Sequence, residues 1–286
     1  MSFDFNQFKR DLIYTDQASV ADIRTSINEI REFDRKTESL LTFLITVMTV
    51  AGLCTLFSLF AFFPLAVIPG SVLAICAVFY FQKKKQDLLN RRYELTMDVV
   101  NALSRDMPKE GQIKLKMDLT APDCTDKKTA SEKVYGWDVT YFEDPWLRLE
   151  GRFTDGTAYD ISMNDRFQSR TKWARSSSGK SKKKSKTKLA TVTSVKLFPK
   201  QKKYVSLAKV TAQTNQLLKL PTWVRIKKVS AEPDLLAVTT VTSEKWSVRR
   251  SDPTTTFDGP EIIYTSLLSL YQVLHESKLR TPNGND

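Results

Sequence analysis

The most distinctive pattern along the chain is a stretch of 42 residues, from Leu40 to Phe81, that contains no Asp, Glu, Lys, Arg or His. A membrane-spanning helix needs about 20 apolar residues, so this length predicts two passes joined by a tight turn. Pro64, Pro69 and Gly70 mark the turn, because these residues break helix geometry. We therefore expect a transmembrane helical hairpin over 40–81, with spans of about 40–60 and 65–81. A hairpin that enters one leaflet only is the alternative.

Amphipathic helices are expected on both sides of this apolar stretch. In the N-terminal region, 1–39, the spacing of Val20, Ile23, Ile27 and Ile30 is that of a coiled-coil stripe. A similar apolar face runs through 82–107, and Pro108 ends that helix. We expect the two helices to extend the spans into an antiparallel stalk, which is also a surface for homo-oligomerisation. Packing of each helix on the C-terminal domain is the alternative.

From Gln112 onward the apolar period changes to two, which predicts β-strands. The clearest hairpin has alternating strands on either side of Asp155-Gly156, a favoured two-residue turn. The domain is expected over 112–278 with a C-terminal helix over 260–278, and the tail over 279–286. The predicted fold class is membrane-anchored α+β: a two-helix transmembrane hairpin with a helical stalk, then a mostly antiparallel β domain with a C-terminal helix. Further strands are expected at 137–141, 192–198, 223–229, 235–242 and 245–249, and a second helix at 207–218.

Basic residues flank both ends of the apolar stretch, whereas its turn carries no charge. Arg31, Arg35 and Lys36 precede it, and Lys83–Lys85 follow it. Because cytoplasmic flanks carry an excess of Lys and Arg, this distribution places both termini in the cytoplasm. The expected location is therefore integral and multi-pass, in the inner membrane of the cell.

The net charge of +12 comes from one part of the chain. Residues 166–231 contain 19 basic residues and no acidic residue. Within this segment, the Lys- and Ser-rich stretch 166–188 is predicted to be a flexible basic loop. Such a loop binds anionic headgroups, binds nucleic-acid phosphates, or is simply solvated; a membrane tether favours lipid. The candidate anion-binding residues are Arg166, Arg170, Lys172, Arg175, Lys180, Lys182, Lys183 and Lys184.

Residues that carry catalysis or metal binding are sparse. His275 is the only histidine, and two of the three cysteines, Cys54 and Cys76, lie inside the apolar stretch. A metal site of Cys and His, or a triad that uses His275, is therefore not expected. Carboxylate pairs such as Glu143 with Asp144 have the chemistry for acid–base catalysis but lack a distinguishing pattern. We predict no cofactor and no enzymatic activity.

Together these patterns predict a membrane-anchored cytoplasmic binding or adaptor protein. Its expected partners are the bilayer itself and either anionic headgroups or an acidic protein at the membrane. Three alternatives stay open. The chain is a structural subunit of a larger membrane assembly, a nucleic-acid-binding membrane protein, or an enzyme that acts on a membrane-associated substrate.

Overall fold

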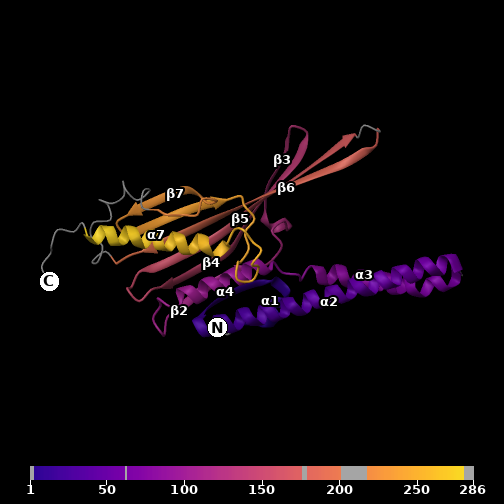
Figure 1. Ribbon diagram of the computed structural model, residues 1–286, viewed down its shortest axis with the longest axis horizontal. Coiled ribbons are helices and arrows are strands. Elements are labelled where there is room, and N and C mark those ends of the chain that lie inside the picture. The colour runs from indigo at the N-terminus through magenta and orange to yellow at the C-terminus, as the bar shows by residue number, and fades with distance from the viewer. Residues whose placement is uncertain (1–2, 62, 176–178, 201–217, 280–286) are drawn as a thin grey trace. The chain divides into compact units, whose positions relative to one another are not determined.

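The computed structural model describes residues 3–61, 63–175, 179–200 and 218–279 (Figure 1). The chain divides into two compact units. The helical unit consists of Thr25–Asn90, and the sheet unit consists of Met1–Arg24 together with Arg91–Asp286.

The helical unit contains the two long apolar helices. α2 covers Val20–Ala61, a short 3-10 helix η1 covers Phe63–Ala66, and α3 covers Val67–Lys84. Both apolar helices are long enough and apolar enough to cross a membrane. The two helices touch through small residues: a Cβ at Gly52 would lie 3.4 Å from Leu73, and one at Gly70 would lie 4.0 Å from Thr55. Small residues are typical of helix contacts in membranes, because they let backbones approach closely.

The hydroxyl groups within the first apolar helix bond to its own backbone. Thr42, Thr46 and Thr49 each donate a hydrogen bond to the carbonyl oxygen four residues earlier, at 2.9 to 3.0 Å. Large apolar side chains such as Phe57 and Phe60 point outward and are 75% and 91% exposed. Over the apolar stretch, the helical unit therefore presents large apolar side chains, and these three hydroxyl groups are satisfied within the helix, an arrangement compatible with a lipid environment.

The sheet unit is built on an antiparallel eight-stranded sheet in the order β1-β2-β4-β5-β6-β8-β7, with β3 paired to β4. Two of its helices are α4, Asn90–Leu103, and α7, Gly259–Leu279. A short helix α1, Phe5–Asp11, precedes β1, and a 3-10 helix η2, Thr125–Lys127, precedes β3. The strands are β1 Ile13–Ser19, β2 Gln112–Asp118, β3 Lys128–Val134, β4 Trp137–Arg152, β5 Ala158–Arg175, β6 Ser181–Phe198, β7 Arg225–Glu232 and β8 Leu235–Thr242.

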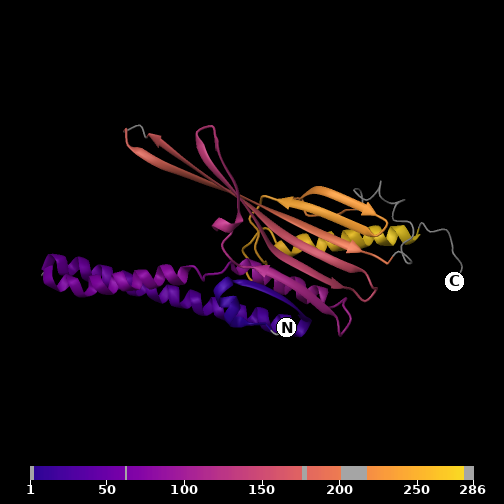
Figure 2. The same ribbon diagram turned by 180° about the vertical axis from the view of Figure 1, so that it is seen from behind.

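Among the residues that the structure describes, α4 and α7 cover one face of the sheet, and we call the other face the open side. α4 and α7 lie on the same side of the strands, in front of them in Figure 1 and behind them in Figure 2. Ile161, Val195 and Val238 point from the strands toward this side, and Leu270 points from α7; all four are fully buried. An antiparallel sheet with one packed face and one solvated face gives the alternation that the sequence shows.

The predicted strands and C-terminal helix are confirmed in outline. The hairpin at Asp155-Gly156 joins β4 to β5, and β8 matches the predicted 235–242. The predicted strand 245–249 is wrong: this segment forms only an isolated bridge from Ser247 to Asp258. Its Trp246 and Val248 are nevertheless buried, so the apolar alternation there reflects core packing. The predicted helix 207–218 lies outside the described residues, apart from residue 218.

The predicted continuous stalk helix over 82–107 is also wrong. α3 ends at Lys84 and α4 begins at Asn90, and the break is held where the Leu88 amide donates a hydrogen bond to the Asp34 carboxylate at 3.0 Å. α4 belongs to the sheet unit, where Leu95, Val99 and Val100 are fully buried. Packing on the domain, the alternative to a stalk, therefore describes this helix.

The N-terminal region contains a strand that the sequence did not predict. β1 pairs with β2 from Ile13 opposite Asp118 to Ser19 opposite Gln112. Tyr14 points into the core and stacks near Phe3, while Phe8 is also buried. The aromatic residues Phe3, Phe8 and Tyr14 therefore pack together within the sheet unit, and residues 1–39 are not a single helical region.

Candidate anion-binding face of the sheet extension

The predicted flexible loop 166–188 is mostly a regular two-stranded hairpin. Residues 166–175 belong to β5 and residues 181–188 to β6, and they pair continuously from Arg166 opposite Ala190 to Arg175 opposite Ser181. Local composition suggested a loop, but the strands continue outward from the core because each residue pairs with its neighbour across the hairpin. The prediction of a flexible loop is therefore corrected.

This hairpin is part of a region that we call the sheet extension, residues 128–143, 166–175 and 181–190. It consists of β3 and the outer parts of β4, β5 and β6, and it projects beyond the helix-covered part of the sheet (Figures 1 and 2). A bulge at Pro145, between the pairs Asp144–Asp165 and Leu147–Met163, marks the boundary between the two parts. Bulges increase local twist, and they accommodate a proline within a strand.

The register assigns each side chain of the extension to a face, because residues directly opposite in an antiparallel pair point the same way. In β5, the helix side carries the odd-numbered residues Met163, Asp165 and Phe167. The even-numbered residues of β5 therefore lie on the open side. The open side of the hairpin carries seven basic residues and no acidic one; we call it the basic face. Its residues are Arg166, Arg170, Lys172, Lys182, Lys184, Lys186 and Lys188.

The structure brings together five of the eight predicted candidate residues. Arg166, Arg170, Lys172, Lys182 and Lys184 share the basic face. Arg175 and Lys183 lie on the opposite side of the hairpin, and Lys180 is exposed in the turn.

Lys186 and Lys188 complete the face but were absent from the predicted set. The alternation of Lys182, Lys184, Lys186 and Lys188 is the signal that would have identified them, if the segment had been treated as a strand.

The carboxylates near the basic face are already paired. Glu143 contacts Arg166 at 3.0 Å, and both side chains are close to half exposed. Glu132 accepts a hydrogen bond from the Tyr141 hydroxyl at 2.5 Å, and this bond raises the pKa of Tyr141. Within the described residues, Lys172, Lys182, Lys184 and Lys188 form no ion pair. Their charge is therefore available to an anion from outside the chain.

Arg166 also lines two hollows of the sheet. A pocket of 810 Å³ includes Phe142, Phe167 and Leu189, which the register places on the helix side, away from the basic face. A second pocket, of 390 Å³, has Arg166, Arg225 and Lys227 around Val192 and Val241 on the open side. In this second pocket the cations surround an apolar floor, which suits an anion that also carries apolar groups.

A second charged cluster lies under the helices and is fully buried. Arg92 on α4 contacts Asp144 at 2.5 Å and Asp165 at 3.2 Å, and none of the three side chains is exposed. Asp165 also accepts a hydrogen bond from Thr191 at 2.7 Å, while Lys127 contacts Asp144 at 2.8 Å. Charges that neutralise one another in the interior attach α4 to the strands, and we assign this cluster to the fold.

Arg91, beside this cluster, contacts Asp165 at 3.2 Å and lies over the ring of Trp246. Burial lowers the pKa of Arg91 and the nearby Asp165 carboxylate opposes that shift. Arg91 therefore interacts with groups of the protein interior, whereas the lysines of the basic face do not.

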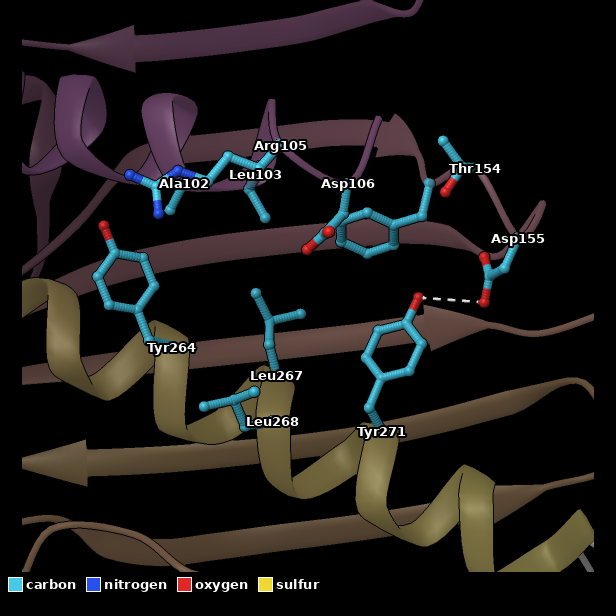
Figure 3. Close-up of a pocket in the computed structure, with 11 residues that line it drawn as sticks. Ala102, Leu103, Arg105, Asp106, Thr154, Asp155, Tyr264, Leu267, Leu268 and Tyr271 are labelled. Atoms are coloured by element: carbon cyan, nitrogen blue, oxygen red, sulfur yellow. Dashed lines mark hydrogen bonds between the residues drawn. The ribbon is translucent and has the colours of Figure 1, made fainter. Parts of the chain in front are cut away.

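A further pocket, of 580 Å³, lies between α4, the β4–β5 turn and α7 (Figure 3). Its lining includes Arg105, Asp106, Thr154, Asp155, Tyr264 and Tyr271 beside apolar residues. The Tyr271 hydroxyl donates to Asp155 at 3.4 Å, and burial is the main cause that raises the pKa of Tyr264 to about 12. His275 is exposed and does not line this pocket. In the part of the chain that the structure describes, no group of three or more His, Cys, Asp or Glu side chains is placed to hold a metal ion.

Comparison of the chain with protein-family models, with curated proteins and with solved structures finds no match. The functional argument therefore rests on the chemistry of the described residues.

Proposed function

We propose that the protein is a membrane-anchored binding module that holds an anionic surface against the basic face of its sheet extension. The observation that carries the proposal is the register of β5 and β6, which gathers seven cations on one exposed face. A regular sheet fixes the spacing of these charges, so binding loses less conformational entropy than it would in a flexible loop.

The anchor in this proposal is the hairpin of α2 and α3. β1 precedes the hairpin and β2 follows it, yet the two strands are paired in one sheet. Both flanks of the hairpin must therefore lie on the same side of a membrane, which requires an even number of crossings. Two spans meet this condition, and the lysines that follow α3 favour the cytoplasmic side.

Anionic phospholipid is the favoured ligand, because the anchor keeps the basic face close to a negatively charged surface. Each basic residue near such a surface contributes about 1 kcal/mol. An acidic protein at the membrane has the same charge and is the alternative ligand. Nucleic acid is a third candidate, since Lys186 lies 5.8 Å from the ring of Trp137 on this face and cations beside aromatic rings suit single strands.

The test uses the full chain embedded in nanodiscs of neutral lipid and mixed with separate liposomes. We expect anionic liposomes to capture the nanodiscs, neutral liposomes to leave them free, and added salt to reverse the capture. The variant Lys182→Ala/Lys184→Ala/Lys186→Ala removes three charges from the face, so affinity should fall roughly 100-fold. The matched control Lys109→Ala/Lys116→Ala/Lys219→Ala removes three exposed lysines outside the extension and should bind almost normally.

Several results would contradict the proposal. Capture that is insensitive to salt, or an equal loss in both triple variants, would show that the basic face is not the binding surface. If polyglutamate or a single-stranded oligonucleotide displaces the liposomes at low concentration, the acidic-protein or nucleic-acid alternative replaces lipid. Persistent association of purified chains through the apolar helices, without capture, would favour a structural subunit.

A further inference from the structure

The tip of the β3–β4 hairpin presents a tyrosine that makes little contact with the rest of the protein. Tyr135 is 95% exposed and occupies the two-residue turn between β3 and β4 with Gly136. Both residues have positive φ, 48° for Tyr135 and 73° for Gly136. Asn, Asp and Gly are the residues that suit such turns, and left-handed backbone is unfavourable for other L-residues. The tyrosine therefore occupies a strained position without compensation from packing.

The neighbouring β5–β6 hairpin also carries an exposed aromatic close to its tip. Trp173 is 68% exposed and lies two residues before the end of β5, opposite Lys183. All five tryptophans are described, and Trp173 is the only exposed one, since Trp146 and Trp246 are buried and Trp137 and Trp223 are partly covered.

The β3–β4 turn lies beside the outer part of β5. β4 and β5 remain paired up to Asp138 opposite Thr171; Asp138 is two residues after Gly136, and Thr171 is two residues before Trp173. A Cβ on Gly136 would lie 3.7 Å from the Lys172 ammonium. Figures 1 and 2 show both hairpins leaving the same end of the sheet.

The surroundings of the two aromatics are strongly basic. Lys172, Arg175, Lys180, Lys182 and Lys183 lie in the outer part of the β5–β6 hairpin. The carboxylates of the β3–β4 hairpin are partnered, Asp138 by Lys133 at 3.7 Å and Glu132 by Tyr141.

From this combination we infer that Tyr135 and Trp173 insert into the headgroup region of an anionic bilayer. The inference rests on the proposed function and deepens it, because it specifies lipid as the ligand and insertion as the binding mode. Trp and Tyr are enriched at membrane–water interfaces, where the ring is partly in an apolar environment and the polar atom stays hydrated. The adjacent lysines meet lipid phosphates at the same depth.

The position of the aromatics favours a bilayer over nucleic acid. A single-stranded nucleic acid stacks successive bases on rings that alternate with cations along a groove. Tyr135 instead lies in the β3–β4 turn, and Trp173 lies near the outer end of β5 on the side opposite the basic face, so neither ring alternates with the cations of that face. Insertion into an interface fits their placement better.

Tryptophan fluorescence of the full chain tests the inference. The chain is held in neutral nanodiscs, and liposomes whose acyl chains are brominated near the headgroup are added. The helical unit has no tryptophan, so quenching of tryptophan fluorescence reports contact between the sheet unit and the liposomes. We expect quenching by anionic liposomes and its loss in Trp173→Phe, a variant that keeps an aromatic ring. Tyr135→Asn should preserve the hairpin, because Asn suits the turn, and should lower both capture and quenching.

The outcomes separate this inference from the proposed function. Capture by anionic liposomes without quenching of Trp173 would overturn insertion and leave binding by the basic face intact. Absence of both capture and quenching would overturn both. Equal quenching by neutral and anionic liposomes would overturn the requirement for anionic lipid. Stronger quenching by an oligonucleotide than by lipid would assign the tips to base stacking.

Discussion

The strands β4, β5 and β6 each pass through two regions of the sheet. Charged side chains are buried and paired in one region and exposed in the other. Under α4 and α7, Asp144 and Asp165 are fully buried and paired with Arg92. Beyond the bulge at Pro145, the strands carry the exposed cations of the basic face, most of which have no ion-pair partner in the described residues. Charges satisfied within the chain contribute to the fold, whereas charges left unsatisfied on a rigid surface are available to a partner. The comparison therefore favours the extension as the binding region that we propose.

Removing the cover from the covered region should have the largest effect. The fragment 112–278, which corresponds to the β domain expected from the sequence, lacks β1 and α4 and would expose the apolar side of the sheet. We expect it to aggregate or to show no cooperative unfolding. A soluble, cooperatively folded fragment would show that the helices are dispensable.

A matched chain that keeps the whole sheet unit should fold. Arg24 donates hydrogen bonds to Asn101 and Ser104, so it lies beside the C-terminal half of α4. Arg91 is ten residues from Asn101 on that helix, about 15 Å away at 1.5 Å per residue. A Gly/Ser linker of about 12 residues spans on the order of 20 Å. Replacing residues 25–90 with this linker should therefore give a soluble chain with a cooperative unfolding transition.

Single substitutions in the two regions should differ sharply in their effect on stability. Arg92→Met leaves two buried carboxylates without their main cation, and we expect the free energy of unfolding to fall by roughly 3–5 kcal/mol. Lys184→Met on the basic face should change it by about 0.5 kcal/mol or less. Denaturant titrations monitored by tryptophan fluorescence measure both. Similar losses in the two variants would remove the distinction between the regions.

Two of the tyrosines with raised pKa, Tyr141 and Tyr264, should respond differently to removal of a charge. In the extension, the hydrogen bond to Glu132 is the main cause that raises the pKa of Tyr141, so Glu132→Gln should lower it toward its ordinary value. In the covered region, burial raises the pKa of Tyr264 to about 12, and the same variant should leave it unchanged. Ultraviolet titration of the phenolate, with each tyrosine replaced by Phe in turn, resolves the two.

The Tyr264 shift also predicts a small loss of stability in alkaline solution. The folded pKa of about 12 lies above the ordinary value of 10.0, so the unfolded chain loses this proton first. The contribution is fully present below about pH 10 and is lost as the pH rises from 10 to 12. Tyr264→Phe should therefore lose less stability than the unsubstituted chain across this interval, as denaturant titrations at each pH can measure. Equal losses would contradict the assignment.

The features that the sequence predicted well depend on local patterns. A charge-free stretch long enough for two spans and a hairpin turn at Asp155-Gly156 are visible within a few dozen residues. β1 was missed because its partner β2 lies about 100 residues later and its own alternation is weak.

The extension was misread for the same reason. Its Lys and Ser content is typical of a flexible segment, whereas its structure depends on pairing that begins in the core. The candidate residues were found from charge alone, but only the register reveals which of them share a face.

The pairing of β1 with β2 also constrains the order of events during synthesis. β1 is made first, but it has no partner until Gln112–Asp118 has been translated, after the whole apolar hairpin. At typical elongation rates of 5–20 residues per second, the strand waits for about 5–20 s as an unpaired segment. If the apolar hairpin enters the bilayer during that interval, it returns the chain to the side where β1 remains. Insertion of the hairpin into the bilayer would then occur first, and the edge strand β1 would pair with β2 after it.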